Sequence, residues 1–175
     1  MKYPQSLKNK QNPKKILIIC SDSRESETKY TDWKFKPGKI FVIRNAGNCA
    51  LFDDALACIH YALLHLKIKT LEIGGHYNCG MMKALLEKNH NDQYISSAVK
   101  FIKKNIFNNQ LPSKDENQLA KENIHRQIEI LLKKDKLVKK LVSRNNLQVI
   151  GSYFDFNLKA TKISLINKNG KVLIK

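Results

Sequence analysis

The sequence predicts an α/β fold with a mainly parallel central β-sheet of about four strands, an antiparallel edge strand, flanking helices and an N-terminal arm. Short continuous apolar runs at residues 16–19, 40–43 and 70–73 are typical of strands buried on both faces of a parallel sheet. The segments between these runs are long enough to cross over the sheet. Consecutive strands are therefore expected to run in the same direction.

The first elements follow from simple local signals. Residues 1–13 are polar, contain two prolines and are expected to form an arm without a core of its own. The run at 16–19 is the first predicted strand. Pro37-Gly38 predicts a turn, and the run at 40–43 follows it as the second strand.

Residues 51–66 carry apolar side chains on almost every side of the predicted helix, which indicates a buried helix, at a subunit interface. Asp53 and Asp54 fall in its first turn, where the helix dipole favours acidic side chains. The third strand is predicted at 70–73, and a further helix is predicted to begin at Gly80.

The second half of the chain starts with a lysine-rich segment, residues 92–144, whose apolar residues recur with helical spacing. A fourth strand is predicted at 148–150. Residues 159–166 and 171–174 resemble the two arms of a closing hairpin, because Asn169-Gly170 between them is a strong turn signal.

Length and composition bound the remaining possibilities. A chain of 175 residues, 42% of them hydrophobic, is large enough for one domain, and we expect a single domain over residues 1–175. It contains neither an apolar stretch that could span a bilayer nor a secretory signal, so we expect a cytoplasmic protein that does not engage membranes. Four cysteines are too few for a disulfide scaffold and are expected to be thiols.

The formal charge of +17 raises the question of a nucleic-acid partner. However, 28 of the basic residues are lysines spread over the whole chain, and only 4 are arginines. Lysine lacks the planar fork that recognises phosphate or guanine with two hydrogen bonds. We therefore expect no specific nucleic-acid partner.

Two groups of polar residues follow the apolar runs. The segment from Cys20 to Arg24 reads Cys-Ser-Asp-Ser-Arg after the first strand, and the segment from His76 to Cys79 reads His-Tyr-Asn-Cys after the third. Ligands of α/β sheets bind at the carboxyl ends of the strands, so both groups can converge. Cys20, His76 and Cys79 form a candidate site for one Zn²⁺ per chain, with the fourth position free as in catalytic zinc.

Asp22 and Arg24 lie beside the predicted ligands. The Asp22 carboxylate can accept a hydrogen bond from zinc-bound hydroxide and so orient it, while Arg24 holds the carboxylate in a bidentate pair. If Arg24 lets go, Asp22 can itself become the fourth ligand and close the site. The sequence permits both states. Cys49 and Cys58 lie in apolar surroundings and are expected to serve only packing.

These residues alone are also compatible with other classes of protein. A basic nucleic-acid-binding module with structural zinc would need a fourth protein ligand and would bind in a salt-sensitive manner. A redox-active protein would use Cys20 and Cys79 as an accessible disulfide without metal. The Asp22–Arg24 pair could also be a purely structural ion pair.

Taken together, these motifs are similar to those of the β-class carbonic anhydrases, in their plant-type branch. The resemblance covers nearly the whole chain and is carried by Gln11-Asn12-Pro13-Lys14, Cys20-Ser21-Asp22-Ser23-Arg24, Pro37-Gly38, Phe41-Val42-Ile43-Arg44-Asn45-Ala46-Gly47-Asn48 and Gly75-His76-Tyr77-Asn78-Cys79-Gly80.

The resemblance implies an activity and a division of roles. It implies reversible hydration of CO₂ to bicarbonate and a proton through zinc-bound hydroxide, with zinc on the two thiols and the imidazole and with Asp22 and Arg24 as the gating and orienting dyad. Hydrolysis of COS or CS₂ on the same fold is the alternative. The implied substrate pocket is lined by Gln11, Phe41, Ala46, Tyr61 and the backbone N–H of Gly80.

The resemblance also implies an assembly, and the chain departs from the family pattern at some positions, among them Glu25. Active sites of the family form at a dimer interface, commonly with the pocket glutamine from the partner chain, so we expect at least a homodimer, or a higher homo-oligomer. Glu25 stands where the family mostly has a small apolar residue. We expect its charge to compete with Asp22 for Arg24.

Overall fold

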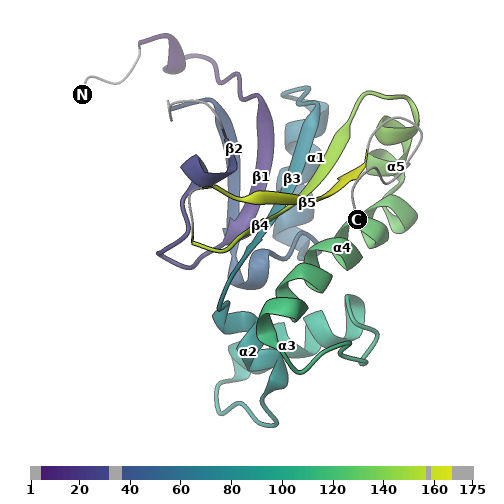
Figure 1. The fold of residues 1–175 in the computed structure, drawn as a ribbon. Helices are drawn as coiled ribbons and strands as arrows, with labels where there is room; N and C mark the ends of the chain where they lie inside the picture. The colour runs from purple at the N-terminus through teal and green to yellow at the C-terminus, as the bar shows by residue number, and fades with distance from the viewer. Residues whose placement is uncertain (1–4, 32–36, 157–158, 167–175) are drawn as a thin grey trace.

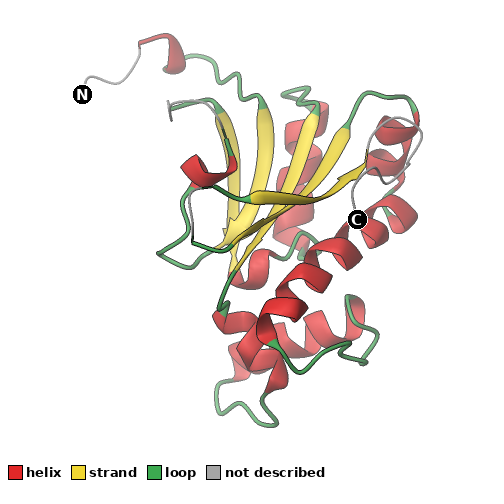
Figure 2. Cartoon of the chain, viewed as in Figure 1, coloured by secondary structure: helices red, strands yellow, loops and turns green. Residues whose placement is uncertain are grey.

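The computed structural model describes residues 5–31, 37–156 and 159–166, the side chains of 164–166 excepted. It contains one mixed sheet and five α-helices (Figures 1 and 2). The strands are β1 (Lys15–Cys20), β2 (Ile40–Asn45), β3 (Thr70–His76), β4 (Gln148–Phe154) and β5 (Thr161–Ile166). The helices are α1 (Asp53–Leu64), α2 (Gly80–Leu86), α3 (Gln93–Asn105), α4 (Glu116–Lys134) and α5 (Lys136–Ser143). Short 3-10 turns lie at Gln5–Leu7 (η1), Glu27–Tyr30 (η2) and Ala46–Asn48 (η3).

The sheet has the strand order β2-β1-β3-β4-β5. Every pair from β2 to β4 is parallel, and β5 joins β4 in the antiparallel direction. This confirms the predicted parallel sheet with an antiparallel edge strand. The second arm of the predicted hairpin, residues 171–174 with the turn Asn169-Gly170, lies outside the described residues.

The two faces of the sheet have different covers. A large apolar cluster on one face joins Ile16, Ile18, Leu71 and Ile73 to residues of all five helices. The opposite face carries a small cluster whose buried members are Leu17, Ile19, Tyr30 and Phe154. Alternate residues of β1 thus face different clusters, which is why the whole strand is buried and reads as a continuous apolar run.

Helix α1 is less buried than the sequence predicts. Ala55, Ile59 and Ala62 are fully buried against the sheet, but Tyr61 and Leu64 are 45% and 46% exposed. A helix that packs against a sheet on one side can bury only one stripe of side chains. In the single chain the helix therefore buries only one stripe, and burial of its remaining apolar side chains at a subunit interface stays a prediction.

The N-terminal segment confirms the expectation of an arm as far as it is described. Residues 5–12 are exposed or half-buried and lead away from the sheet (Figure 1). Among the described residues, none of the helices is long and apolar enough to cross a bilayer.

A close approach between β3 and Tyr30 constrains the small cluster. A Cβ added at Gly74 would lie 2.4 Å from Cε1 of Tyr30 and 2.9 Å from Cγ2 of Ile19. No side chain larger than that of glycine fits there without displacing the ring. Gly80 is a contrast, because nothing lies within 4 Å of a Cβ built at that position.

We predict that Gly74→Ala lowers the free energy of unfolding by about 1–3 kcal/mol, because the methyl group overfills the space beneath Tyr30. Gly80→Ala is the matched control and should change it by less than about 0.5 kcal/mol. Urea denaturation followed by circular dichroism measures both. Equal stability of the two variants would contradict the close packing.

Candidate metal centre

Two neighbouring parallel strands and one helix bring Cys20, His76 and Cys79 together. In the register of β1 and β3, Ile18 lies opposite Ile73, so Cys20 and His76 both stand at the carboxyl end of the sheet. Cys79 precedes the first residue of α2. Asn78 has a φ of 57°, a left-handed conformation that asparagine tolerates, and this residue turns the chain between the two ligands on this side.

The three side chains have the geometry of a metal site. One ligand atom from each, two Sγ and one imidazole nitrogen, lies within 4.8 Å of the others, and all three residues are buried. The two Sγ atoms are 4.0 Å apart. Zinc–sulfur bonds of about 2.3 Å at the tetrahedral angle would place them about 3.8 Å apart. The donors present therefore fit a zinc ion.

The imidazole of His76 is oriented as a ligand. Its Nδ1 lies 2.9 Å from the carbonyl oxygen of Tyr77 and donates its proton there. Its Nε2 is buried and has no hydrogen-bond partner. A hydrogen bond at one ring nitrogen fixes the tautomer that leaves a lone pair on the other, as in metal-binding histidines.

The two thiols lie close enough for a hydrogen bond between their sulfurs, in which either can be the donor. This contact with Cys79 outweighs burial and lowers the pKa of Cys20 to about 4. The same hydrogen bond and burial raise the pKa of Cys79 far above its usual value. Cys49 has no such partner, and burial raises its pKa to about 12, in agreement with a packing role.

Asp22 and Arg24 form a bidentate pair beside the ligands. Arg24 donates from Nε to Asp22 Oδ1 at 2.9 Å and from Nη2 to Oδ2 at 2.6 Å. This pairing holds the pKa of the Asp22 carboxyl well below its usual range. Asp22 Oδ2 lies 4.0 Å from Nε2 of His76. The guanidinium also covers the ring of Phe156, 4.8 Å from its centroid.

Glu25 does not compete for Arg24, so that prediction is wrong. Its side chain turns inward and is 3% exposed. Its carboxylate accepts hydrogen bonds from the backbone N–H of Cys20 at 2.9 Å and from the hydroxyl of Tyr30. The physical reason is chain geometry. The Glu25 carboxylate lies beneath the strand ends within reach of two donors, and the guanidinium of Arg24 already donates to both carboxylate oxygens of Asp22.

The residues predicted to line the pocket fall into two groups. Gly80 and Ala46 lie near the candidate ligands. Gly80 begins α2 directly after Cys79, and Ala46 follows Asn45, the last residue of β2, which pairs with Cys20. Phe41 instead pairs with Ile16, four residues before Cys20. At ~3.3 Å per residue, this places it about 13 Å back along the sheet.

Gln11 and Tyr61 also lie away from the ligands in the single chain. They share a hollow of about 690 Å³ between the N-terminal arm and the end of α1, and none of the three ligand residues lines it. Phe41 is beside it, with its ring centroid 6.3 Å from that of Tyr61. Within one chain, the structure thus groups Gln11, Phe41 and Tyr61 with one another rather than with the cysteines.

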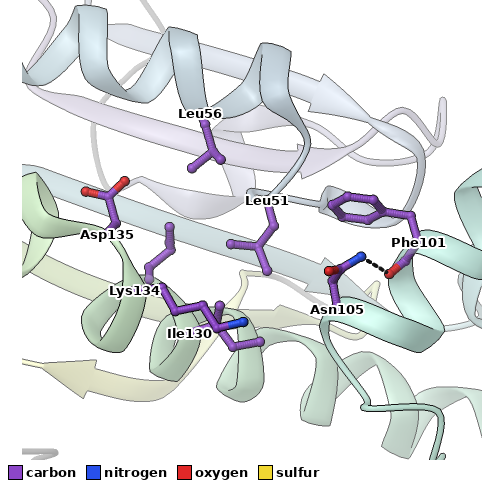
Figure 3. A pocket seen from close by; sticks show the side chains of 8 residues that line it. Leu51, Leu56, Phe101, Asn105, Ile130, Lys134 and Asp135 are labelled. Carbon is purple, nitrogen blue, oxygen red and sulfur yellow. Dashed lines mark hydrogen bonds between the residues drawn. The ribbon is translucent and has the colours of Figure 1, made fainter.

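A second hollow, of about 220 Å³, opens near α1, α3 and α4 (Figure 3). Its lining is mostly apolar, with Asn105, Lys134 and Asp135 as the polar members. None of the residues predicted for the site lines this hollow. It is therefore separate from the metal centre.

Sequence analysis missed two buried amides on α4. Gln127 Oε1 accepts from the backbone N–H of Ala50 at 2.6 Å, and Asn123 Nδ2 donates to the carbonyl oxygen of Gly47 at 3.1 Å. Both residues are fully buried and shape the turn after β2. Their spacing of four residues beside an apolar helical stripe is the signal that could have identified them.

The chain matches known sequences and structures. The family profile described as carbonic anhydrase matches residues 15–160. A carbonic anhydrase of Synechocystis is 39% identical over 90 residues, which is 49% of this chain and 32% of that protein. The alignment thus spans about a third of the length of this curated relative.

Two solved structures share the fold. A tetrameric β-carbonic anhydrase of Sordaria macrospora has a TM-score of 0.75 at 25% identity, covering 90% of this chain and 84% of that one. The Coccomyxa β-carbonic anhydrase, solved with acetazolamide, has a TM-score of 0.70 at 27% identity, covering 90% and 75%. With the family match over most of its length, the chain belongs to the β-carbonic anhydrases.

Proposed function

We propose that the chain is a zinc enzyme that interconverts CO₂ with bicarbonate and a proton. One observation carries the proposal: two cysteine sulfurs and an unpartnered imidazole nitrogen converge in a buried site, with a paired carboxylate beside them. Family membership supports the same activity.

Cys20, His76 and Cys79 would hold the metal. A zinc ion bound there would supply Lewis acidity that activates a water for attack on the carbon of CO₂. Two thiolates and a neutral imidazole balance its charge, so neighbouring groups must assist the loss of the proton. In the described residues the cluster has three members and no fourth protein ligand, which supports a catalytic rather than a purely structural site.

Asp22 is the group placed to assist the loss of a proton from the water. Its lowered pKa keeps it ionised at physiological pH, so it can accept a hydrogen bond from a water and fix the direction of that water's lone pair. Arg24 holds both carboxylate oxygens and thereby keeps Asp22 from acting as a ligand itself. If Arg24 released these two hydrogen bonds, Asp22 could become the fourth metal ligand and exclude the water. We propose that the two residues act as such a gate.

The alternatives have less support. A redox role needs an accessible thiol pair, but Cys79 is fully buried and Cys20 is 6% exposed. A nucleic-acid-binding module with structural zinc needs a closed coordination sphere. Hydrolysis of COS or CS₂ would use the same residues, and only turnover measurements separate it from hydration of CO₂.

We further propose that the working unit is a homo-oligomer in which two chains complete each substrate pocket. Gln11, Phe41 and Tyr61 lie away from the ligands of their own chain, so a second chain is needed to bring such side chains to the metal. The exposed Tyr61 and Leu64 of α1 supply apolar surface for this contact. The Sordaria macrospora relative is a tetramer.

The first prediction from the proposed function concerns catalysis. Asp22→Ala should lower the rate of CO₂ hydration about 10²-fold or more, because the carboxylate acts on the reacting water. The zinc content should stay at that of the wild type. Stopped-flow hydration with a pH indicator and elemental analysis measure the two quantities, with Asp53→Asn on the exposed start of α1 as the control.

Wild-type turnover by the Asp22→Ala protein would contradict the proposed role of the dyad. Faster turnover of COS than of CO₂ by the wild type would favour the alternative activity.

The second prediction concerns metal binding. The hydrogen bond between the two sulfurs needs a proton on one of them, so the metal-free pair keeps at least one thiol proton at pH 7. Since zinc takes both as thiolates, its binding to the metal-free protein should release at least one proton. Calorimetric titration in two buffers of different ionisation enthalpy gives this number.

Cys49→Ala should leave the proton count unchanged, because this thiol stays protonated and outside the cluster. Zinc binding without proton release would show that the thiols do not ligate the ion.

The third prediction concerns assembly. A Cys20→Ser chain lacks a ligand and a Gln11→Ala chain lacks a pocket side chain, so each alone should be nearly inactive. When the two are co-expressed, random pairing should leave about a quarter of the sites intact if two chains form each pocket. Hydration activity of the mixed protein, compared with each variant alone, measures this. Activity no higher than the average of the two variants would show that each chain forms its own site.

A further inference from the structure

The Glu25 carboxylate is buried but has no part in the proposed catalytic steps. Its side chain is 3% exposed and lies beneath the carboxyl ends of the strands. A carboxylate is costly to bury unless hydrogen bonds compensate for the loss of water. The arrangement of its partners therefore indicates what it does.

These partners connect two strands that carry metal ligands. Oε2 accepts the backbone N–H of Cys20 at 2.9 Å, and Oε1 accepts the hydroxyl of Tyr30. The same hydroxyl lies 3.3 Å from the carbonyl oxygen of Gly75, the residue before His76. Because the hydroxyl has one proton and donates it to Glu25, its approach to Gly75 is the weaker contact. A chain of polar contacts thus runs from the Cys20 backbone through Glu25 and Tyr30 to β3.

The segment from Glu25 to Tyr30 has contacts on two further sides. The ring of Tyr30 lies against the backbone of Gly74, where a Cβ would be 2.4 Å from its Cε1. Arg44 on β2 donates from Nη2 to the carbonyl oxygen of Glu25 at 2.6 Å and pairs with Glu27 at 3.3 Å. Glu25 is therefore fixed by direct contacts to β1 and β2 and, through Tyr30, by a contact to β3.

We propose that Glu25 is a positioning residue that arranges the ligands before metal binds. It fixes the backbone of Cys20 and, through Tyr30, the approach of the strand that ends at His76. This inference rests on the proposed zinc site. Hydrogen-bonded groups behind metal ligands commonly contribute about 10–100-fold to metal affinity.

Two substitutions separate geometry from charge. Glu25→Gln keeps an oxygen that accepts from Cys20, and its amide can donate to the oxygen of Tyr30 while that hydroxyl donates to Gly75. Glu25→Ala removes both connections and leaves the buried N–H of Cys20 without a partner.

The experiment measures zinc affinity of the whole chain by competition with a chromophoric chelator. Glu25→Ala should weaken zinc binding about tenfold or more, whereas Glu25→Gln should stay within about twofold of the wild type. The absorption of the Co²⁺-substituted protein should change in the alanine variant and not in the glutamine variant. Val142→Ala removes buried side-chain atoms from α5 and so controls for lowered stability. It should leave the zinc affinity unchanged.

Wild-type affinity and spectrum in Glu25→Ala would overturn the inference. So would equal loss in both variants, because charge rather than hydrogen-bond geometry would then be responsible. If Glu25→Ala does not fold, Tyr30→Phe breaks the link to Gly75 while keeping the ring on Gly74. Unchanged affinity in that variant would overturn the inference as well.

The inference and the proposed function fail differently. A wild-type chain that binds no zinc defeats the proposed function. A wild-type chain that binds zinc and hydrates CO₂, with variants that bind zinc equally well, defeats only the role of Glu25.

Discussion

The parallel register of β1 and β3 is the constraint on which the candidate metal centre depends. Ile18 pairs with Ile73, and Cys20 and His76 follow at the same edge of the sheet. A slip by one residue would exchange the two faces of a strand and carry its apolar side chains to the wrong cluster. The hydrophobic packing that fixes this register therefore also fixes the distance between the ligands.

Around this edge, the acidic groups differ in environment and hence in the roles that we propose for them. Asp22 lies on the outer side, where the half-exposed Arg24 pairs with it and keeps it ionised. Glu25 lies on the inner side and bonds to the backbone of Cys20 and to Tyr30. One carboxylate is free to meet a water and the other is fixed in the protein interior, although only three positions separate them in the chain.

Local patterns were enough to predict the strands, the helix after Cys79 and the convergence of Cys20, His76 and Cys79. Continuous apolar runs specify strands buried on both faces, and parallel strands bring their ends together without further information. The inward direction of Glu25 could not be predicted, because its partner Tyr30 meets it only through the fold of the segment between them.

The pocket residues illustrate a second limit. Their residue types are the same whether they serve their own chain or another, so the sequence cannot tell where they act. The position of Phe41 opposite Ile16, far back along the sheet, becomes visible only in the register of β1 and β2.

The unequal covers of the sheet have a consequence for dynamics. The larger cluster includes all five helices, whereas the smaller one, within the described residues, contains none of them and depends on Tyr30 and Phe154. Segments with few buried apolar contacts open locally at lower free energy than the global core. The 25–30 segment can therefore exchange its amide hydrogens through partial opening while the helical layer stays intact. The proposed support of Cys20 and His76 by Glu25 thus lies on the face of the sheet that, among the described residues, buries fewer apolar side chains.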